Sequence, residues 1–174
     1  GGNSNQGTAI VGTVSGTSIS FGTAVVFESG QSNFISVAFD SASNKIVIAY
    51  RDGGNSDYGT AIVGTVSGTS ISFGSAAVFQ SASCLFNTAV FDSSSNKIVI
   101  AYRDGGNSNQ GTAIVGTVSG TSISFGTAVV FDTGDSVDIS GAFDSDANKV
   151  VFSYQDGGNS YVGTAVVGTV SGTS

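Results

Sequence analysis

The sequence contains no histidine and only one cysteine, Cys84. Without histidine, the chain lacks the commonest general base and the commonest transition-metal ligand. A single cysteine can form neither an internal disulfide nor a multi-cysteine metal site, and we expect Cys84 to pack as a small apolar residue. The abundant serines have no partner that would activate them as nucleophiles. We therefore expect a non-enzymatic protein without a cofactor.

Basic residues are also scarce: 5 Lys and Arg stand against 12 Asp and Glu, a net charge of -7. This balance disfavours nucleic acid and anionic lipid as partners, because both require a basic surface. The apolar runs are too short to cross a bilayer, so we expect no membrane insertion. The chain opens at Gly1 without a signal peptide or Met. We interpret Gly1 as a processing point, the boundary of an expressed segment or the edge of a larger protein.

Helix-forming residues are few, whereas Gly, Ser, Thr, Val and Ile dominate, and these favour strands and turns. The same letters return every 52 residues, in repeats 1–52, 53–104 and 105–156 and in a partial copy, 157–174. A fixed period of this size indicates an array of one supersecondary unit. We expect a single repeat domain over residues 1–174.

Each repeat is expected to hold four short strands, here labelled A (Phe34–Phe39), B (Lys45–Tyr50), C (Gly59–Val66) and D (Ile71–Phe79). The polar stretches 40–44 and 67–70 are predicted to be tight turns between A and B and between C and D. Four antiparallel strands per repeat predict an all-β fold, a β-propeller; a β-solenoid is the alternative.

The chain would supply 13 strands, about three and a quarter blades, fewer than propellers typically need. We therefore expect either a segment of a longer protein or a homo-oligomer. In the oligomer, the N-terminal C and D strands of one copy would complete the last blade of another.

The repeats differ in two places. Segments 31–38, 83–90 and 135–142 correspond to one another and change at almost every position, as do the pairs 5–6, 57–58, 109–110 and 161–162. In an up-and-down blade, both places fall at the end that carries the B–C and D–A loops. Variation confined to one end of a constant scaffold is typical of a recognition surface; drift among duplicated copies is the alternative. The candidate ligand-binding residues are Asn33, Phe34, Asp57, Tyr58, Leu85, Phe86, Asn109, Gln110, Asp135, Asp138 and Tyr161.

Three further groups of residues carry side chains that bear on binding or catalysis. The stretch Asp52–Asp57 carries several oxygen side chains and could bind calcium weakly, although a turn stabilised by Gly and Asx residues is the favoured interpretation. The acidic residues form no pair suited to glycoside hydrolysis. Arg51 and Arg103 are expected beside Asp52 and Asp104, as exposed pairs or ligand contacts.

The motifs Asn-Lys-Ile-Val-Ile-Ala-Tyr-Arg-Asp-Gly-Gly-Asn-Ser and Gly-Thr-Ala-Ile-Val-Gly-Thr-Val-Ser-Gly-Thr-Ser-Ile-Ser-Phe-Gly span nearly the whole chain. They resemble a repeat of uncharacterised surface or tail-fibre-like proteins from marine phages and environmental sequences. The resemblance implies an extracellular or virion-surface protein. Lectin propellers are similar in period and strand count only.

The function expected from the sequence is adhesion, or recognition of a glycan or cell-surface receptor, through the variable end. The alternative is a purely structural repeat that assembles into a ring or filament.

Overall fold

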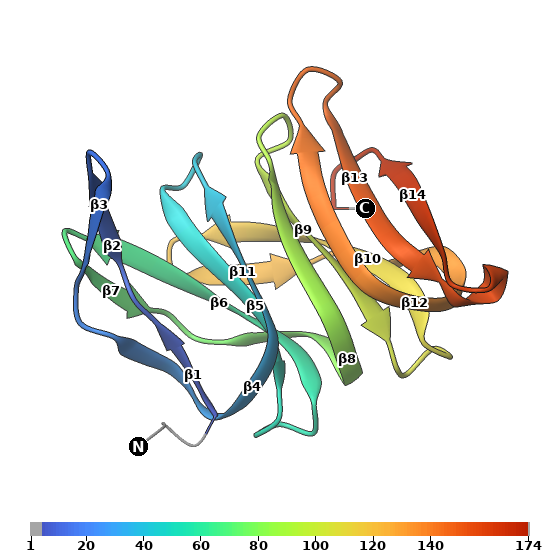
Figure 1. Cartoon of the computed structure of the whole chain (residues 1–174), viewed down its shortest axis with the longest axis horizontal. Helices are drawn as coiled ribbons and strands as arrows, with labels where there is room; N and C mark the ends of the chain where they lie inside the picture. The colour runs from blue at the N-terminus through green and yellow to red at the C-terminus, as the bar shows by residue number, and fades with distance from the viewer. Residues whose placement is uncertain (1–4, 174) are drawn as a thin grey trace.

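The computed structural model describes residues 5–173, which form antiparallel β-sheets joined by short turns (Figure 1). The strands are β1 (Gln6–Ala9), β2 (Gly12–Ser15), β3 (Ser18–Phe21), β4 (Val25–Asp40), β5 (Lys45–Asp52), β6 (Tyr58–Ser67), β7 (Ser70–Phe73), β8 (Ala77–Asp92), β9 (Lys97–Asp104), β10 (Gln110–Ser119), β11 (Ser122–Phe125), β12 (Val129–Asp144), β13 (Lys149–Asp156) and β14 (Val162–Gly168). One short 3-10 helix, η1 (Gly157–Asn159), precedes β14. Within residues 5–173, no helix is long and apolar enough to span a bilayer. The prediction of an all-β fold is confirmed.

Three long strands, β4, β8 and β12, each take part in two sheets. In β8, residues 77–83 pair with β6, and residues 84–92 pair with β9. The expected loop between strands D and A is therefore wrong: the chain bends at a bulge and continues as the same strand. The interruption lies instead at Gly74-Ser75-Ala76, inside the range predicted for strand D. The first part of the predicted strand D is a short strand of its own, and its second part is continuous with strand A. The strand boundaries in residues 5–173 therefore differ from those of the 13 strands expected.

The long strands divide the fold into four units. Sheet I contains the second part of β4, then β5, β6, β7 and the first part of β8; sheet II repeats this arrangement from β8 to β12. Sheet III contains the second part of β12, then β13 and β14. The N-terminal half-sheet contains β1, β2, β3 and the first part of β4. The central strands β5, β9 and β13 of the three sheets follow one another from left to right in Figure 1.

The core lies between successive sheets. Alternate residues of a strand point to opposite faces, and β5 shows this directly: Val47 and Ala49 pack toward sheet II, against Ile98 and Tyr102, in one cluster. Tyr50 belongs to another cluster, with residues of the N-terminal half-sheet. The central strand of a repeat is therefore buried on both faces, which explains why it reads Ile-Val-Ile-Ala-Tyr without polar alternation.

Glycine allows neighbouring sheets to come close at the interruption before each long strand. A β-carbon placed on Gly74 would lie 2.0 Å from the carbonyl oxygen of Thr121, in the turn of the next sheet. Gly22 and Gly126 have the same relation to Thr69 and Thr173. Since such distances are impossible for a real side chain, the repeated glycine is required for sheet-to-sheet packing.

The turn between β4 and β5 confirms the predicted tight link. The Asp40 carboxylate accepts hydrogen bonds from the backbone N–H groups of Ala42 and Ser43, both at 3.0 Å, and Asn44 adopts the left-handed conformation with φ 56°. Asp92 and Asp144 repeat this arrangement. These turns form a constant end, opposite the end where the repeats differ.

Candidate recognition rim

The two sets of variable residues meet at one end of the sheets, here called the variable rim. The backbone N–H of Ser32 donates to the carbonyl oxygen of Asn5 at 3.0 Å. In the next repeat, Cys84 donates to Asp57 at 3.1 Å, and Ser136 donates to Asn109 at the same distance. Residues about 27 positions apart in the sequence are therefore hydrogen-bonded neighbours, once per repeat.

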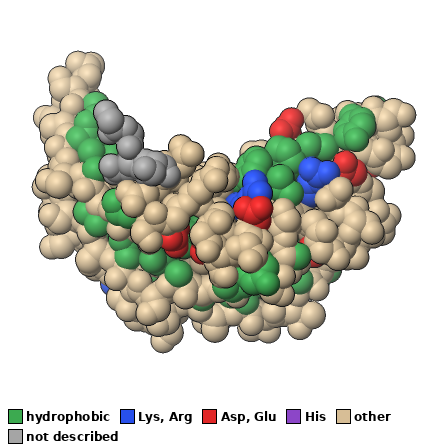
Figure 2. All heavy atoms as spheres, turned by 90° about the horizontal axis from the view of Figure 1, so that it is seen from below, with side chains coloured by type: hydrophobic (Ala, Val, Ile, Leu, Met, Phe, Trp, Pro, Cys, Tyr) green, Lys and Arg blue, Asp and Glu red, His purple; other side chains and the backbone are tan. Residues whose placement is uncertain are grey.

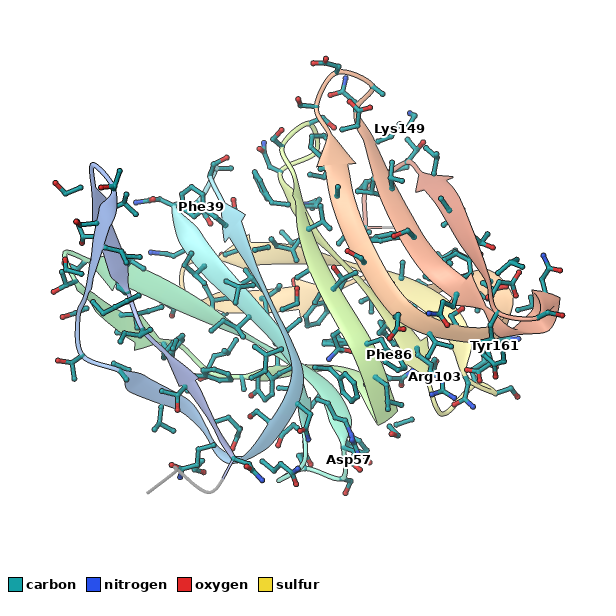
Figure 3. All side chains as sticks on the ribbon, in the orientation of Figure 1. Phe39, Asp57, Phe86, Arg103, Lys149 and Tyr161 are labelled. Carbon is teal, nitrogen blue, oxygen red and sulfur yellow. The ribbon has the colours of Figure 1, made fainter. Side chains whose placement is uncertain are left out.

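All the candidate residues lie at this rim: Asn33, Phe34, Asp57, Tyr58, Leu85, Phe86, Asn109, Gln110, Asp135, Asp138 and Tyr161. Figure 3 shows Asp57, Phe86, Arg103 and Tyr161 at one end and Phe39 and Lys149 at the other. The second half of each long variable segment leaves the rim, because Ser36–Ala38 continue along β4 and pair with β5. Part of the variation therefore affects contacts between sheets: the Ser36 hydroxyl accepts a hydrogen bond from the Ala89 N–H at 2.9 Å.

A bulge presents one residue of each long strand at the rim. Phe34, Phe86 and Asp138 occupy equivalent positions with φ angles of 50°, 52° and 51°, and the ladder to the neighbouring strand is interrupted there each time. The left-handed conformation costs a residue with a β-carbon about 1–2 kcal/mol, and glycine would avoid this cost. Backbone strain of this kind is concentrated at functional sites, so the phenylalanines mark the rim as a candidate site.

The two phenylalanines form an aromatic cluster across neighbouring repeats. The ring centroids of Phe34 and Phe86 lie 5.1 Å apart, and the Arg103 guanidinium lies 6.0 Å from the Phe86 centroid. In the third repeat, Asp138 takes the phenylalanine position and accepts a hydrogen bond from Gln155 at 3.1 Å. The rim therefore changes from aromatic to polar along the row of repeats.

Two ion pairs flank the aromatic cluster. Arg51 pairs with Asp57 across the turn between β5 and β6, whereas Arg103 Nε lies 2.7 Å from Asp135 Oδ1 on β12. The expected pairing with Asp52 and Asp104 is wrong, because adjacent residues of a strand point to opposite faces. All four side chains remain partly exposed. Figure 2, which views this end, shows basic and acidic side chains side by side near a hollow in the outline.

Below the rim, each repeat holds a buried tyrosine next to acidic or amide groups. Tyr50 donates to Glu28 Oε2 at 3.3 Å, and burial, followed by the Glu28 and Asp52 charges, raises the pKa of this tyrosine. The pKa of Asp52 is also raised, chiefly by burial and then by Glu28. In the next repeat, Gln80 of β8 takes the place of the glutamate and donates to Asp104 at 2.6 Å. These groups form the floor of the rim.

The glycine-rich turns are held by aspartate. Asp52 Oδ1 accepts the Gly54 N–H at 3.0 Å, and Asp104 Oδ1 accepts the Gly106 N–H at 2.9 Å. These contacts support the interpretation of Asp52–Asp57 as an Asx-stabilised turn. Calcium binding there stays a prediction. No group of three or more potential metal ligands occurs within the part of the chain that the structure describes.

Sequence reasoning placed the candidate residues at one end but missed two parts of the site. The Arg103–Asp135 pair joins residues 32 positions apart, through a long strand that was not foreseen. The ring pair could have been suspected from the period, since Phe34 and Phe86 differ by 52 positions. Equivalent residues of stacked repeats are expected to lie near one another.

The fold and rim define a repeat protein of antiparallel sheets with one variable end. Comparisons of the chain with protein-family models, curated proteins and solved structures give no match.

Proposed function

We propose that this chain is a non-enzymatic recognition module, a segment of a β-propeller whose variable rim binds carbohydrate on a surface receptor. The observation that carries the proposal is the meeting of both variable sets at one rim, through the bonds of Ser32, Cys84 and Ser136, while the opposite end is nearly constant. Drift among duplicated repeats gives no reason for variation to gather at one end.

The propeller assignment is supported by the arrangement of the sheets. Each complete sheet is a four-stranded antiparallel meander with a split outer strand, and successive sheets stack face to face. The inner long strands of neighbouring sheets contact one another, as the bond from Ala89 to Ser36 and the Phe34–Phe86 pair show. Antiparallel pairing of this kind favours a propeller over the alternative solenoid.

The chemistry of the rim suits a sugar. Aromatic faces stack on the apolar side of a pyranose ring, and Phe34, Phe86, Tyr58 and Tyr161 supply such surfaces. The Arg51–Asp57 and Arg103–Asp135 pairs offer charged donors and acceptors suited to hydroxyl groups. Because both arginines are already paired and the net charge is -7, a neutral glycan fits better than an acidic one. A role at a virion or cell surface follows from this proposal and from the resemblance of the repeat.

A second function has its own support. The face of sheet I that is turned toward the N-terminal half-sheet carries three exposed apolar side chains: Ile35 (47%), Val37 (58%) and Phe39 (52%). Such apolar faces favour self-association. A purely structural repeat would use these faces and would need no rim ligand.

A glycan array tests the proposal, with variants that exchange residues between repeats. Phe86→Asp introduces the residue that the third repeat carries at the same backbone conformation, so the bulge should tolerate it. We expect Phe86→Asp to weaken binding about tenfold, the effect of a loss of about 1.4 kcal/mol. The double change Asp57→Asn with Tyr58→Gln copies residues 109–110 and should also weaken binding.

The matched control lies at the constant end. Ala42→Ser copies Ser94 of the second repeat and should leave both binding and thermal stability unchanged. The proposal is wrong if the unaltered protein binds no glycan, or if both rim variants bind as well as the control.

A further inference from the structure

Sheets I, II and III pack face to face, and each contact joins the same two surfaces of the repeat. One of these surfaces is exposed on sheet I, and the other is exposed on sheet III. Toward the following repeat, Val63 and Val115 are 0% and 4% exposed, but the equivalent Val167 is 64% exposed. Toward the preceding repeat, Ile139 is 8% exposed, but the equivalent Ile35 is 47% exposed. The same positions are therefore buried between sheets and open at the two ends.

The open face of sheet I forms an apolar groove. Ile35, Val37 and Ile46 line it together with Ala9 and Phe27 of the N-terminal half-sheet. The half-sheet covers only the outer part of sheet I, through strands of types C and D. The inner part is the place where strands of types A and B would pack, as the second part of β8 and β9 do against β12 and β13.

Sheet III has the complementary structure. It contains strands of types A, B and C, namely the second part of β12, then β13 and β14, and β14 is the last strand in the order of the sheet. Its outer face carries Val151 and Val167 at positions where sheets I and II bury Val47 and Val63. The A and B strands of sheet III are therefore chemically suited to the open groove of another copy.

The strand that would have to be exchanged is duplicated in the sequence. Residues 163–173 repeat residues 7–17 with a single difference, Val166 in place of Ile10. β13 pairs with β14 in the register that β5 uses with β6. Residues 7–14 of a second copy can therefore replace β14 beside β13 with almost the same side chains, and they bring the D strand that follows them.

We propose that two copies of this chain associate head to tail, each placing the A and B strands of its sheet III beside the N-terminal half-sheet of the other. Each copy then supplies sheets I and II and two halves of another sheet, three sheets in all, so two copies close a ring of six. Propellers typically have four to eight blades; one copy would give three and three copies nine. The proposal rests on the propeller architecture and is independent of the rim ligand.

Mass measurement by size exclusion with light scattering tests the association directly. The full chain of 17.2 kDa should elute with twice that mass and dissociate on dilution. Val37→Asp places a charge in the groove at a side chain that is 58% exposed, so the isolated chain should still fold, and the variant should be monomeric. Val78→Asp is the matched control: Val78 lies at the outer edge of sheet I, and the equivalent Val130 of sheet II remains 40% exposed although sheet I packs against its face, so the variant should remain dimeric.

A cross-link tests the geometry. Ser36 and Ala89 touch between sheets I and II; the equivalent pair across the proposed junction is Ser140 of one copy and Val37 of the other. The chain with Cys84→Ser, Ser140→Cys and Val37→Cys should therefore form covalent dimers under oxidation. Each single new cysteine alone should give far less covalent dimer.

Covalent dimers from the paired cysteines, together with a dimeric mass, would support the six-sheet ring. A monomer at every concentration with no cross-link would overturn the proposal. A ladder of higher multiples would overturn the closed ring, because it would indicate an open filament. These readouts need no glycan, so they can fail while the recognition function stands, and the reverse is also possible.

Discussion

Replacing Glu28 by glutamine should stabilise the protein, because the half-buried Glu28 of the N-terminal half-sheet lies close to the buried Asp52 of sheet I. Burial, and then the Glu28 carboxylate, raises the pKa of Asp52, which means that the ionised pair opposes folding at neutral pH. The next repeat contains the natural alternative: Gln80 of β8 donates to the Asp104 carboxylate of β9 at 2.6 Å. Glu28→Gln would give sheet I this same contact.

The size of the gain follows from the bond formed. A hydrogen bond to a charged group contributes about 1.5–3 kcal/mol, and part of this is offset because Tyr50 loses a charged acceptor at 3.3 Å. We expect a net gain of about 1.5 kcal/mol, or about 3–6 °C in Tm for a chain of this length. Differential scanning calorimetry at pH 7 measures it.

The pH dependence provides a second readout. A carboxyl whose pKa is raised on folding stabilises the native state below its unfolded pKa, and this contribution is lost as the pH rises through the folded pKa. The Asp52 contribution to the unfolding free energy should therefore fall between its ordinary pKa and its raised one, and Glu28→Gln should flatten this dependence. Gln80→Glu is the matched reverse change and should lower Tm. The reasoning is refuted if Glu28→Gln lowers Tm or if Gln80→Glu raises it.

Three further predictions concern stability. Asp92→Ala should lower the free energy of unfolding by about 1–2 kcal/mol in urea. Burial alone would raise the pKa of Asp92, but hydrogen bonds from Ser94 and Ser95 lower it overall, so the stabilisation should disappear as the pH falls through the lowered pKa. Equal stability of the variant and the parent would contradict this. Gly74→Ala should cost more than about 2 kcal/mol, because its β-carbon would meet the Thr121 carbonyl, whereas Gly163→Ala has free space and should be close to neutral in the same assay. Cys84, fully buried and with a pKa raised by burial, should resist alkylation in the native state and react after unfolding; rapid labelling of the folded protein would count against its position.

Much of the architecture could be predicted from the sequence because it depends on periodicity. The 52-residue repeat, the central strand of each repeat and the tight turn at Asp40 follow from periodicity and local composition. Local rules could not predict that strands D and A are continuous, because the polar residues of 80–83 look like a loop but belong to the part of β8 that pairs with β6. The bulge at Phe86 could not be predicted either, because phenylalanine normally favours an extended strand. Its left-handed conformation is set by the surrounding sheets.

The site was predicted at the level of position and not of contact. Strand direction alone placed Asp57 and Asp135 at one end, but the pairing of Asp135 with Arg103 depended on the path of the long strand β12 beside β10. The paths of β4 and β8 likewise bring Phe34 against Phe86. Contacts between repeats could therefore be identified only from the structure, whereas many contacts within a repeat could be predicted from the spacing of residues in the sequence.

The long strands have a consequence for how the protein comes apart. Since β8 is hydrogen-bonded to β6 along its first part and to β9 along its second, neither sheet can melt without releasing half of a strand that the other one uses. Unfolding of one repeat should therefore spread to its neighbour. The row of nearly identical repeats should consequently unfold in one cooperative transition, whereas independently folding repeats would unfold one after another.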